Sequence, residues 1–260
     1  MLPCHIYMVY PDPSPAESVT APSPGHQRLI AAGEILLCSS LPTQLVIGFL
    51  LRAAGLAPTA SDDQLSPAFV FTLLLADSIV LIALMIGLTR AHGESPSAMW
   101  LGVRPPAREF AIGLALVPLV FLMVGLVMNG LLRVLPGLHN VEANPIERLA
   151  SGGPQDAAML GVIAILAGGV REELQRVFLL RRFEQHLGGA TLGVLVLSIA
   201  FGLGHFPQGW DAVITTGLLG AFWAVVYLRR RSSIAPMVSH AGFNSLEVLR
   251  VALIGSSTGS

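Results

Sequence analysis

The sequence predicts an all-α membrane protein, a polytopic bundle of about seven transmembrane helices. Of its 260 residues, 53% are apolar and only 12% are charged, which is about half the charged fraction of a typical soluble domain. The mean hydropathy is +0.69, and the apolar residues are gathered in long uncharged runs. Since a helix needs roughly 20 mainly apolar residues to cross a bilayer, these runs are candidate spans.

Seven stretches are candidate spans. The two clearest are 111–129, which carries no charge, and 68–88, which is interrupted only by Asp77. We expect Asp77 to pair with a polar group inside the bundle, because an unpaired charge at membrane depth is costly. The stretch 35–51 has a polar middle and is predicted to kink there. The remaining candidates are 157–170, 191–206, 212–228 and 235–254.

Arginine placement predicts the orientation. All 15 basic residues are Arg, so lysine-dependent chemistry such as a P-loop or a Schiff base is excluded. Short cytoplasmic loops carry an excess of positive charge, and counting Arg on alternate sides of the seven spans gives 9 on the side of the N-terminus and 3 on the other. We therefore expect a bacterial cytoplasmic membrane protein with its N-terminus in the cytoplasm. A net charge of -1 leaves no basic surface for nucleic acid.

The chain divides into four parts. Residues 1–27 are Pro-rich, lack the pattern of a cleavable signal peptide, and are predicted to form a flexible tail. Residues 28–154 hold the first membrane helices, 155–254 hold a core rich in polar motifs, and 255–260 form a short tail. The two cysteines, Cys4 and Cys38, cannot make a disulfide framework or a cysteine metal site.

Polar residues within the apolar stretches are concentrated in the C-terminal half. Each buried charge costs about 2.5–3.5 kcal/mol on insertion scales, so each is a functional candidate. Residues four apart share one helix face, which predicts one polar stripe on each of three helices. The pairs are Glu172 with Arg176, Phe201 with His205, and His240 with Asn244.

These residue types suit hydrolysis. A carboxylate beside a neutral imidazole in a water-poor cavity can hold and deprotonate a water molecule, either directly or through a metal ion. An Asn amide can donate a hydrogen bond to an oxyanion. The three stripes together fit cleavage of an acyl bond.

Three ordered motifs resemble those of a known family. They are Glu172-Glu173-Leu174-Gln175-Arg176, Phe201-x-x-x-His205 and His240-x-x-x-Asn244, and they resemble the CPBP family, also called ABI, over about residues 155 to 250. That family contains the CAAX prenyl proteases of the second type and bacteriocin-processing or self-immunity proteins. The first motif departs from the family, because two residues instead of three separate the Glu pair from Arg, and Val177 stands where Arg is expected.

The resemblance implies an intramembrane endopeptidase in which Glu172 activates the attacking water. It implies that His205 assists Glu172 or holds a metal, and that His240 and Asn244 stabilise the oxyanion or complete a metal shell. Glu173 would orient its neighbours, and Arg176 would reach Glu172 by i, i+4 geometry. The resemblance leaves open whether His205 and His240 hold a divalent metal such as Zn²⁺. The implied substrate is a membrane-associated peptide or protein, such as a leader peptide or a prenylated-like segment.

A second class of function stays open at this point. The same buried carboxylates and imidazoles could serve a non-enzymatic immunity protein or a transport pathway. Outside the motifs, Glu34 is expected at a helix start near Arg28, and the loop histidines, among them His92 and His139, have no evident partner. No His-Glu-x-x-His is present, which disfavours a site-2 type metalloprotease.

Overall fold

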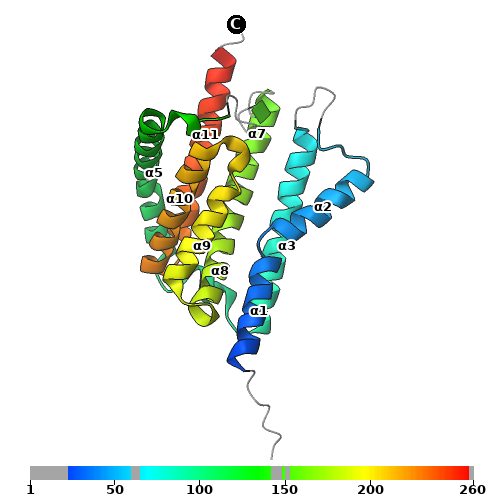
Figure 1. The fold of residues 1–260 in the computed structure, drawn as a ribbon, viewed down its shortest axis with the longest axis vertical. Helices are drawn as coiled ribbons and strands as arrows, with labels where there is room; N and C mark the ends of the chain where they lie inside the picture. The colour runs from blue at the N-terminus through cyan, green and yellow to red at the C-terminus, as the bar shows by residue number, and fades with distance from the viewer. Residues whose placement is uncertain (1–22, 60–64, 142–147, 150–152, 258–260) are drawn as a thin grey trace, which may run out of the picture.

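The computed structural model describes residues 23–59, 65–141, 148–149 and 153–257, and these form a bundle of helices (Figure 1). Its longer elements in chain order are α1 (Pro24–Leu37), α2 (Leu41–Ala53), α3 (Pro67–Ala91), α5 (Pro106–Val134), α7 (Pro154–Ile163), the π-helix η2 (Ala164–Arg171), α8 (Glu172–His186), α9 (Ala190–Leu203), α10 (Trp210–Arg230) and α11 (Ile234–Ser257). Short turns of helix lie between them at α4 (Pro96–Trp100), η1 (Pro136–Leu138) and η3 (Phe206–Gln208). The described residues contain one isolated β-bridge, between Thr59 and Leu65, and no strand.

The predicted all-α membrane bundle is confirmed, and the seven predicted stretches are mostly helical, although 35–51 is interrupted at residues 38–40 and 191–206 extends past the end of α9 at Leu203. Within the described residues, four helical stretches are long and apolar enough to cross a membrane on their own: Pro24–Ala53, Pro67–Ala91, Pro106–Val134 and Trp210–Arg230. The helix Ala190–Leu203 is apolar but shorter. The stretch 157–170 is divided between α7 and η2, and α11 carries the polar residues of the third motif.

Several helices begin at a Ser-Pro pair. Ser23, Ser66 and Ser95 are the N-caps of α1, α3 and α4, and each hydroxyl accepts a hydrogen bond from a backbone N–H three residues later. The proline that follows suits the first helical position, where no backbone N–H is needed. The first helix therefore begins at Pro24, inside the predicted tail of 1–27, most of which lies outside the described residues, as does Cys4.

The predicted kink in the first span is a break between α1 and α2. Ser40 has φ 71° in the left-handed region, which turns the chain so that α2 leaves α1 at an angle (Figure 1). Asp77 on α3 is fully buried and accepts hydrogen bonds from Thr43 and from Gln44 at 3.2 Å. The expected polar partner of Asp77 is thus confirmed, and it comes from the start of α2.

A continuous helical rod formed by α7, η2 and α8 runs through the middle of the bundle. Its central part is π-helical from Ala164 to Arg171, and such wide turns occur often at functional sites. Gly168 and Gly169 let α11 approach closely, since a Cβ on Gly169 would lie 2.5 Å from that of Ala241. The close contact sets the third motif against the first.

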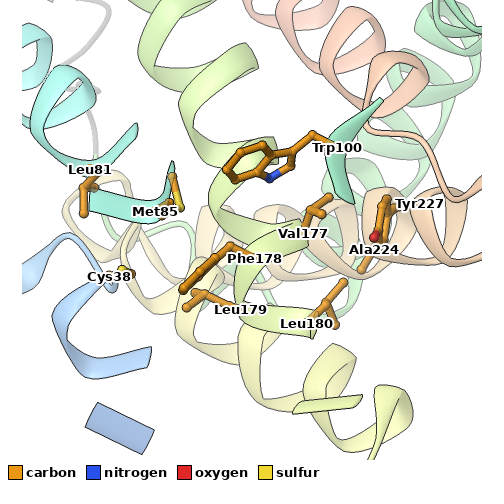
Figure 2. Close-up of a cluster of buried hydrophobic side chains, with 10 residues drawn as sticks. All are labelled: Cys38, Leu81, Met85, Trp100, Val177, Phe178, Leu179, Leu180, Ala224 and Tyr227. Atoms are coloured by element: carbon orange, nitrogen blue, oxygen red, sulfur yellow. The ribbon is translucent and has the colours of Figure 1, made fainter. Parts of the chain in front are cut away.

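The main apolar core surrounds α8 (Figure 2). It joins this helix to the end of α1, to α3, α4 and α10, and Trp100 is held in it by a hydrogen bond from Nε1 to the carbonyl of Leu174 at 3.0 Å. Val177, which occupies the family's Arg position, is 1% exposed and belongs to this core. The core members are Cys38, Leu81, Met85, Trp100, Val177, Phe178, Leu179, Leu180, Ala224 and Tyr227.

Ion pairs cross-link one end of the bundle, where α1 begins and α3, α8 and α10 end. Glu34 is buried on α1 and contacts both Arg182 at 2.6 Å and His92 at 2.5 Å. Its expected place at a helix start near Arg28 is therefore corrected, and His92 has a partner. Glu109 at the start of α5 pairs with Arg230 at 2.5 Å. Most of the arginines assigned to the cytoplasmic side by the sequence lie at this end.

Candidate active site

A cavity of about 590 Å³ lies between α3, α5, the α7–η2–α8 rod, α9, α10 and α11. Its walls are mostly apolar, and polar groups of all three motifs line it. The structure brings Glu172, His205, His240 and Asn244 to this one cavity. These four groups were predicted to act together, and they come from three separate parts of the chain.

Glu172 is the carboxylate that faces the cavity. It is the first residue of α8, and its side chain is 20% exposed. Its Oε1 lies 3.3 Å from Nη2 of Arg171, and its Oε2 lies 3.9 Å from Nε2 of His240. Among the residues that the structure describes, none makes a hydrogen bond to the oxygen nearer to His240, so a water molecule could be held between these two groups.

Glu173 points away from the cavity and is 1% exposed. Its Oε1 accepts hydrogen bonds from Arg176 and, at 2.8 Å, from Nδ1 of His240. Arg176 thus pairs with Glu173 in place of its predicted partner Glu172. Arg176 lies three residues from Glu173 on the same helix, and Val177 belongs to the apolar core. Glu173 serves as a fixed buried anion that holds two cationic or donor groups.

Two aromatic rings pack against the imidazole of His240. The indole of Trp223 on α10 stacks on the imidazole with ring centroids 3.8 Å apart and an angle of 17°. Phe201 meets the same imidazole edge-on at 6.1 Å, and the guanidinium carbon of Arg176 lies 4.7 Å from the Phe201 ring centroid. Such contacts between an aromatic face and a cation are attractive, more so when desolvated. Phe201 therefore packs against the catalytic candidates.

His205 follows the end of α9 and presents one nitrogen to the cavity. Its Nδ1 donates to the carbonyl of Phe201, one helical turn earlier, at 2.8 Å. This bond assigns the proton to Nδ1 in the neutral ring and leaves Nε2 as the acceptor. The spacing of the second motif thus sets the tautomer of His205 as well as its position.

Asn244 lies one turn after His240 on α11 and packs against a glycine of η2. A Cβ on Gly168 would collide with Nδ2 of the Asn244 side chain, so only glycine fits at this position without displacing the amide. Gly168 and the π-helix carry no motif that the sequence analysis recognised. The signal that could have found them is the Gly-Gly pair directly before the first motif.

The predicted metal at His205 and His240 stays a prediction. In the parts of the chain that the structure describes, no group of three His, Cys, Asp or Glu side chains is arranged to hold a metal ion. Nδ1 of each ring is already hydrogen-bonded, so one nitrogen per ring could bind an ion. The described residues therefore do not offer three ready ligands for an ion at this place.

A second histidine–carboxylate pair lines the cavity near the start of α10. His139 follows η1, and its Nδ1 lies 2.6 Å from Oδ2 of the buried Asp211. The expectation that His139 has no partner is thus corrected. Sequence reasoning missed the pair because its members are 72 positions apart and lie on no common motif.

Comparison with known families agrees with the geometry. Residues 154–246 match the family described as type II CAAX prenyl endopeptidase Rce1-like. Over these residues the chain is similar to that family. The match begins at α7 and ends within α11, so the Rce1-like segment contains all six predicted site residues. No curated protein and no solved structure gives a significant match to the chain.

The family fixes the class of the protein at a coarse level. Rce1-like domains are described as endopeptidases, which supports a protease acting on a peptide at the membrane. The apolar helices and the family together make the chain a multi-pass integral membrane protein. The helices before residue 154 lie outside the match.

Proposed function

We propose that the protein is an intramembrane endopeptidase in which Glu172 acts as the general base on a water molecule. The observation that carries the proposal is the unequal placement of the two adjacent glutamates. Glu172 faces the cavity with one oxygen toward His240, whereas Glu173 is buried and bound to Arg176 and His240. A general base must reach the water that it deprotonates, and only Glu172 of the pair lies on the cavity.

The other residues follow from their contacts. The water loses its proton to Glu172 and attacks the peptide carbonyl, and the amide of Asn244 donates to the oxyanion that forms. His240, held through Nδ1 by Glu173, directs Nε2 toward the same region and adds a second donor when protonated. His205 Nε2 can assist Glu172 in returning the proton to the leaving amine.

The cavity favours a substrate that is itself embedded in the membrane. Its walls are mostly apolar, so burying an apolar segment of substrate there is favourable. A leader peptide or a prenylated-like membrane-associated chain has this character. We propose the bacterial cytoplasmic membrane as the location, with the N-terminus in the cytoplasm, from the distribution of Arg.

The test is a comparison of protein N-termini in membranes. The parent, Glu172→Gln and Glu247→Gln would be expressed at equal levels in cells that lack the gene, and new N-termini would be enriched and sequenced. Glu247 is the matched control, because it is a second carboxylate that lines the cavity, paired with Arg250 at 2.9 Å. We expect new N-termini with the parent and the control, and a loss of at least about 10²-fold with Glu172→Gln.

Two results would overturn the proposal. One is cleavage by Glu172→Gln at the parental rate. The other is full rescue of the null phenotype by the same variant, which would instead support the non-enzymatic immunity or transport function.

A further inference from the structure

Arg171 is a buried arginine that belongs to none of the three motifs. It is the last residue of the π-helix η2, directly before Glu172, and is 5% exposed. Its Nη2 lies 3.3 Å from Oε1 of Glu172, and its Nη1 donates to Gln175 Oε1 and to Ser40 Oγ, both at 2.8 Å. A buried guanidinium needs such partners to offset its desolvation. Arg171 therefore connects the candidate base to a residue 131 positions away.

The far end of this connection is the break between α1 and α2. Gln175 Nε2 donates to the carbonyl of Cys38 at 2.6 Å and to Ser40 Oγ at 3.1 Å. Ser40 is one of two non-glycine residues with positive φ among those that the structure describes. Such a conformation is unfavourable for a residue with a side chain and persists where its surroundings determine it, often at functional sites. The hydrogen bonds from Arg171 and Gln175 to Ser40 hold it in this conformation.

The two carboxylate oxygens of Glu172 have different neighbours. Arg171 binds Oε1, and this leaves Oε2 as the oxygen that faces Nε2 of His240. The guanidinium restricts rotation of the carboxylate, because it holds one of the two oxygens in place. Without Arg171, the direction of the carboxylate is not set by a neighbour on this side.

We propose that Arg171 is a positioning residue for Glu172 and that the α1–α2 break is its anchor. The proposal rests on the proposed function of Glu172. It extends the catalytic unit beyond residues 154–246, since Cys38 and Ser40 lie in the break between α1 and α2, which the family match does not cover. The N-terminal helices then contribute to the geometry of the active site as well as to the bundle.

The kinetic test uses Arg171→Gln, Arg171→Lys and Ser40→Gly in the purified full chain. The substrate is a peptide that contains a cleavage site identified by sequencing of the new N-termini. Ser40→Gly removes the hydroxyl and keeps a residue that adopts positive φ readily. Ser39→Ala is the control, because Ser39 lies in the same break, is exposed, and donates only to the carbonyl of Leu36 at 2.7 Å.

We expect Arg171→Gln to lower kcat by about 10²-fold with KM changed less than about threefold, because a displaced group costs this much in rate. Arg171→Lys restores activity to within about tenfold of the parent. A merely structural role would not produce this combination of a lower kcat, a nearly unchanged KM and rescue by lysine.

Hydrogen–deuterium exchange gives a readout that does not depend on activity. Arg171→Gln and Ser40→Gly should raise exchange in residues 36–44, and Ser39→Ala should not. Parental kcat in Arg171→Gln would overturn the positioning role and leave the proposed function standing. If Arg171→Gln does not fold, the other two variants decide. A parental kcat in Ser40→Gly, together with an Arg171→Lys variant that folds but lacks activity, would overturn the positioning role. If the parent cleaves no peptide while exchange rises as expected in Arg171→Gln and Ser40→Gly, the proposed function and the positioning role are both overturned. The hydrogen-bonded connection between Arg171 and the α1–α2 break would then be structural only.

Discussion

The imidazole of His240 donates from Nδ1 to Oε1 of Glu173 at 2.8 Å. This bond makes the second glutamate of the pair a support for the third motif. Two adjacent carboxylates that look equivalent in the sequence therefore have different tasks, because successive residues of a helix point about 100° apart.

Replacing Glu173 should destabilise the protein more than replacing another paired carboxylate of the same helix. In Glu173→Ala the buried Arg176 loses its partner, which costs about 3–5 kcal/mol. Glu184→Ala is the matched control on α8, since its partner Arg231 is 55% exposed and such surface pairs contribute at most about 1 kcal/mol. Thermal unfolding in one detergent compares the two. An equal change in Tm would contradict the role of Glu173 as a buried anchor.

A methyl group at Gly168 should impair catalysis through Asn244. The added Cβ of Gly168→Ala would collide with the Asn244 amide, which lies at the end of a flexible side chain, so the variant should displace the amide more than it destabilises the fold. We expect kcat to fall by about 10-fold or more as the oxyanion donor moves. Gly161→Ala is the control on the same rod, where a Cβ has no neighbour within 4 Å. Parental kcat in both variants would mean that Asn244 does not act as a donor.

Acid should weaken the network at the Arg-rich end through Glu94, which lies between α3 and α4. Burial raises the pKa of Glu94, but hydrogen bonds from Arg182, Gln185 and Arg181 outweigh it and hold the pKa below its usual range. The stability that this group contributes is present above its unfolded pKa of about 4.3 and is lost as pH falls through the lower folded value.

Glu94→Gln tests this dependence. We expect a Tm about 2–4 °C below that of the parent at pH 7, which corresponds to about 1 kcal/mol, and a difference that shrinks below about pH 4. Thermal unfolding between pH 7 and 3 measures it. A difference that grows in acid would have the wrong sign.

The cavity should be reached from the side of the membrane opposite to most of the arginines. Its lining includes residues from the start of α10 and the second half of α11, which lie at the end of the bundle away from the start of α1 (Figure 1). Val103 and Val134 flank α5 at its two ends and are both well exposed.

Single cysteines at Val103 and Val134, in a Cys4→Ser and Cys38→Ala background, distinguish the two sides. We expect an impermeant maleimide to label Val134→Cys and not Val103→Cys in right-side-out vesicles. Detergent should make both reactive, which shows that the two thiols are available. The opposite pattern would reverse the orientation derived from Arg and place the cavity on the cytoplasmic side.

The sequence predicted the helices and the site members better than their contacts. Apolar length located each span, and the kink at the first one followed from its polar middle. Helical spacing grouped the motif residues correctly, but it could not choose between Glu172 and Glu173 as partner of Arg176, because both steps keep residues on one face. Trp223 was missed because an aromatic residue in an apolar helix is more often core. Its contact with His240 depends on how α10 and α11 pack.

That stacking of Trp223 on His240 also gives the protein an optical reporter of its own site. Indole emission responds to the charge and distance of a group that lies against its face. A change at His240, whether it gains a proton or is displaced by a bound peptide, should therefore alter the fluorescence of this tryptophan. Trp100 and Trp210 lie elsewhere in the bundle and can be replaced by Phe to isolate the signal. Binding could then be followed in the unlabelled protein, before any cleavage product has been identified.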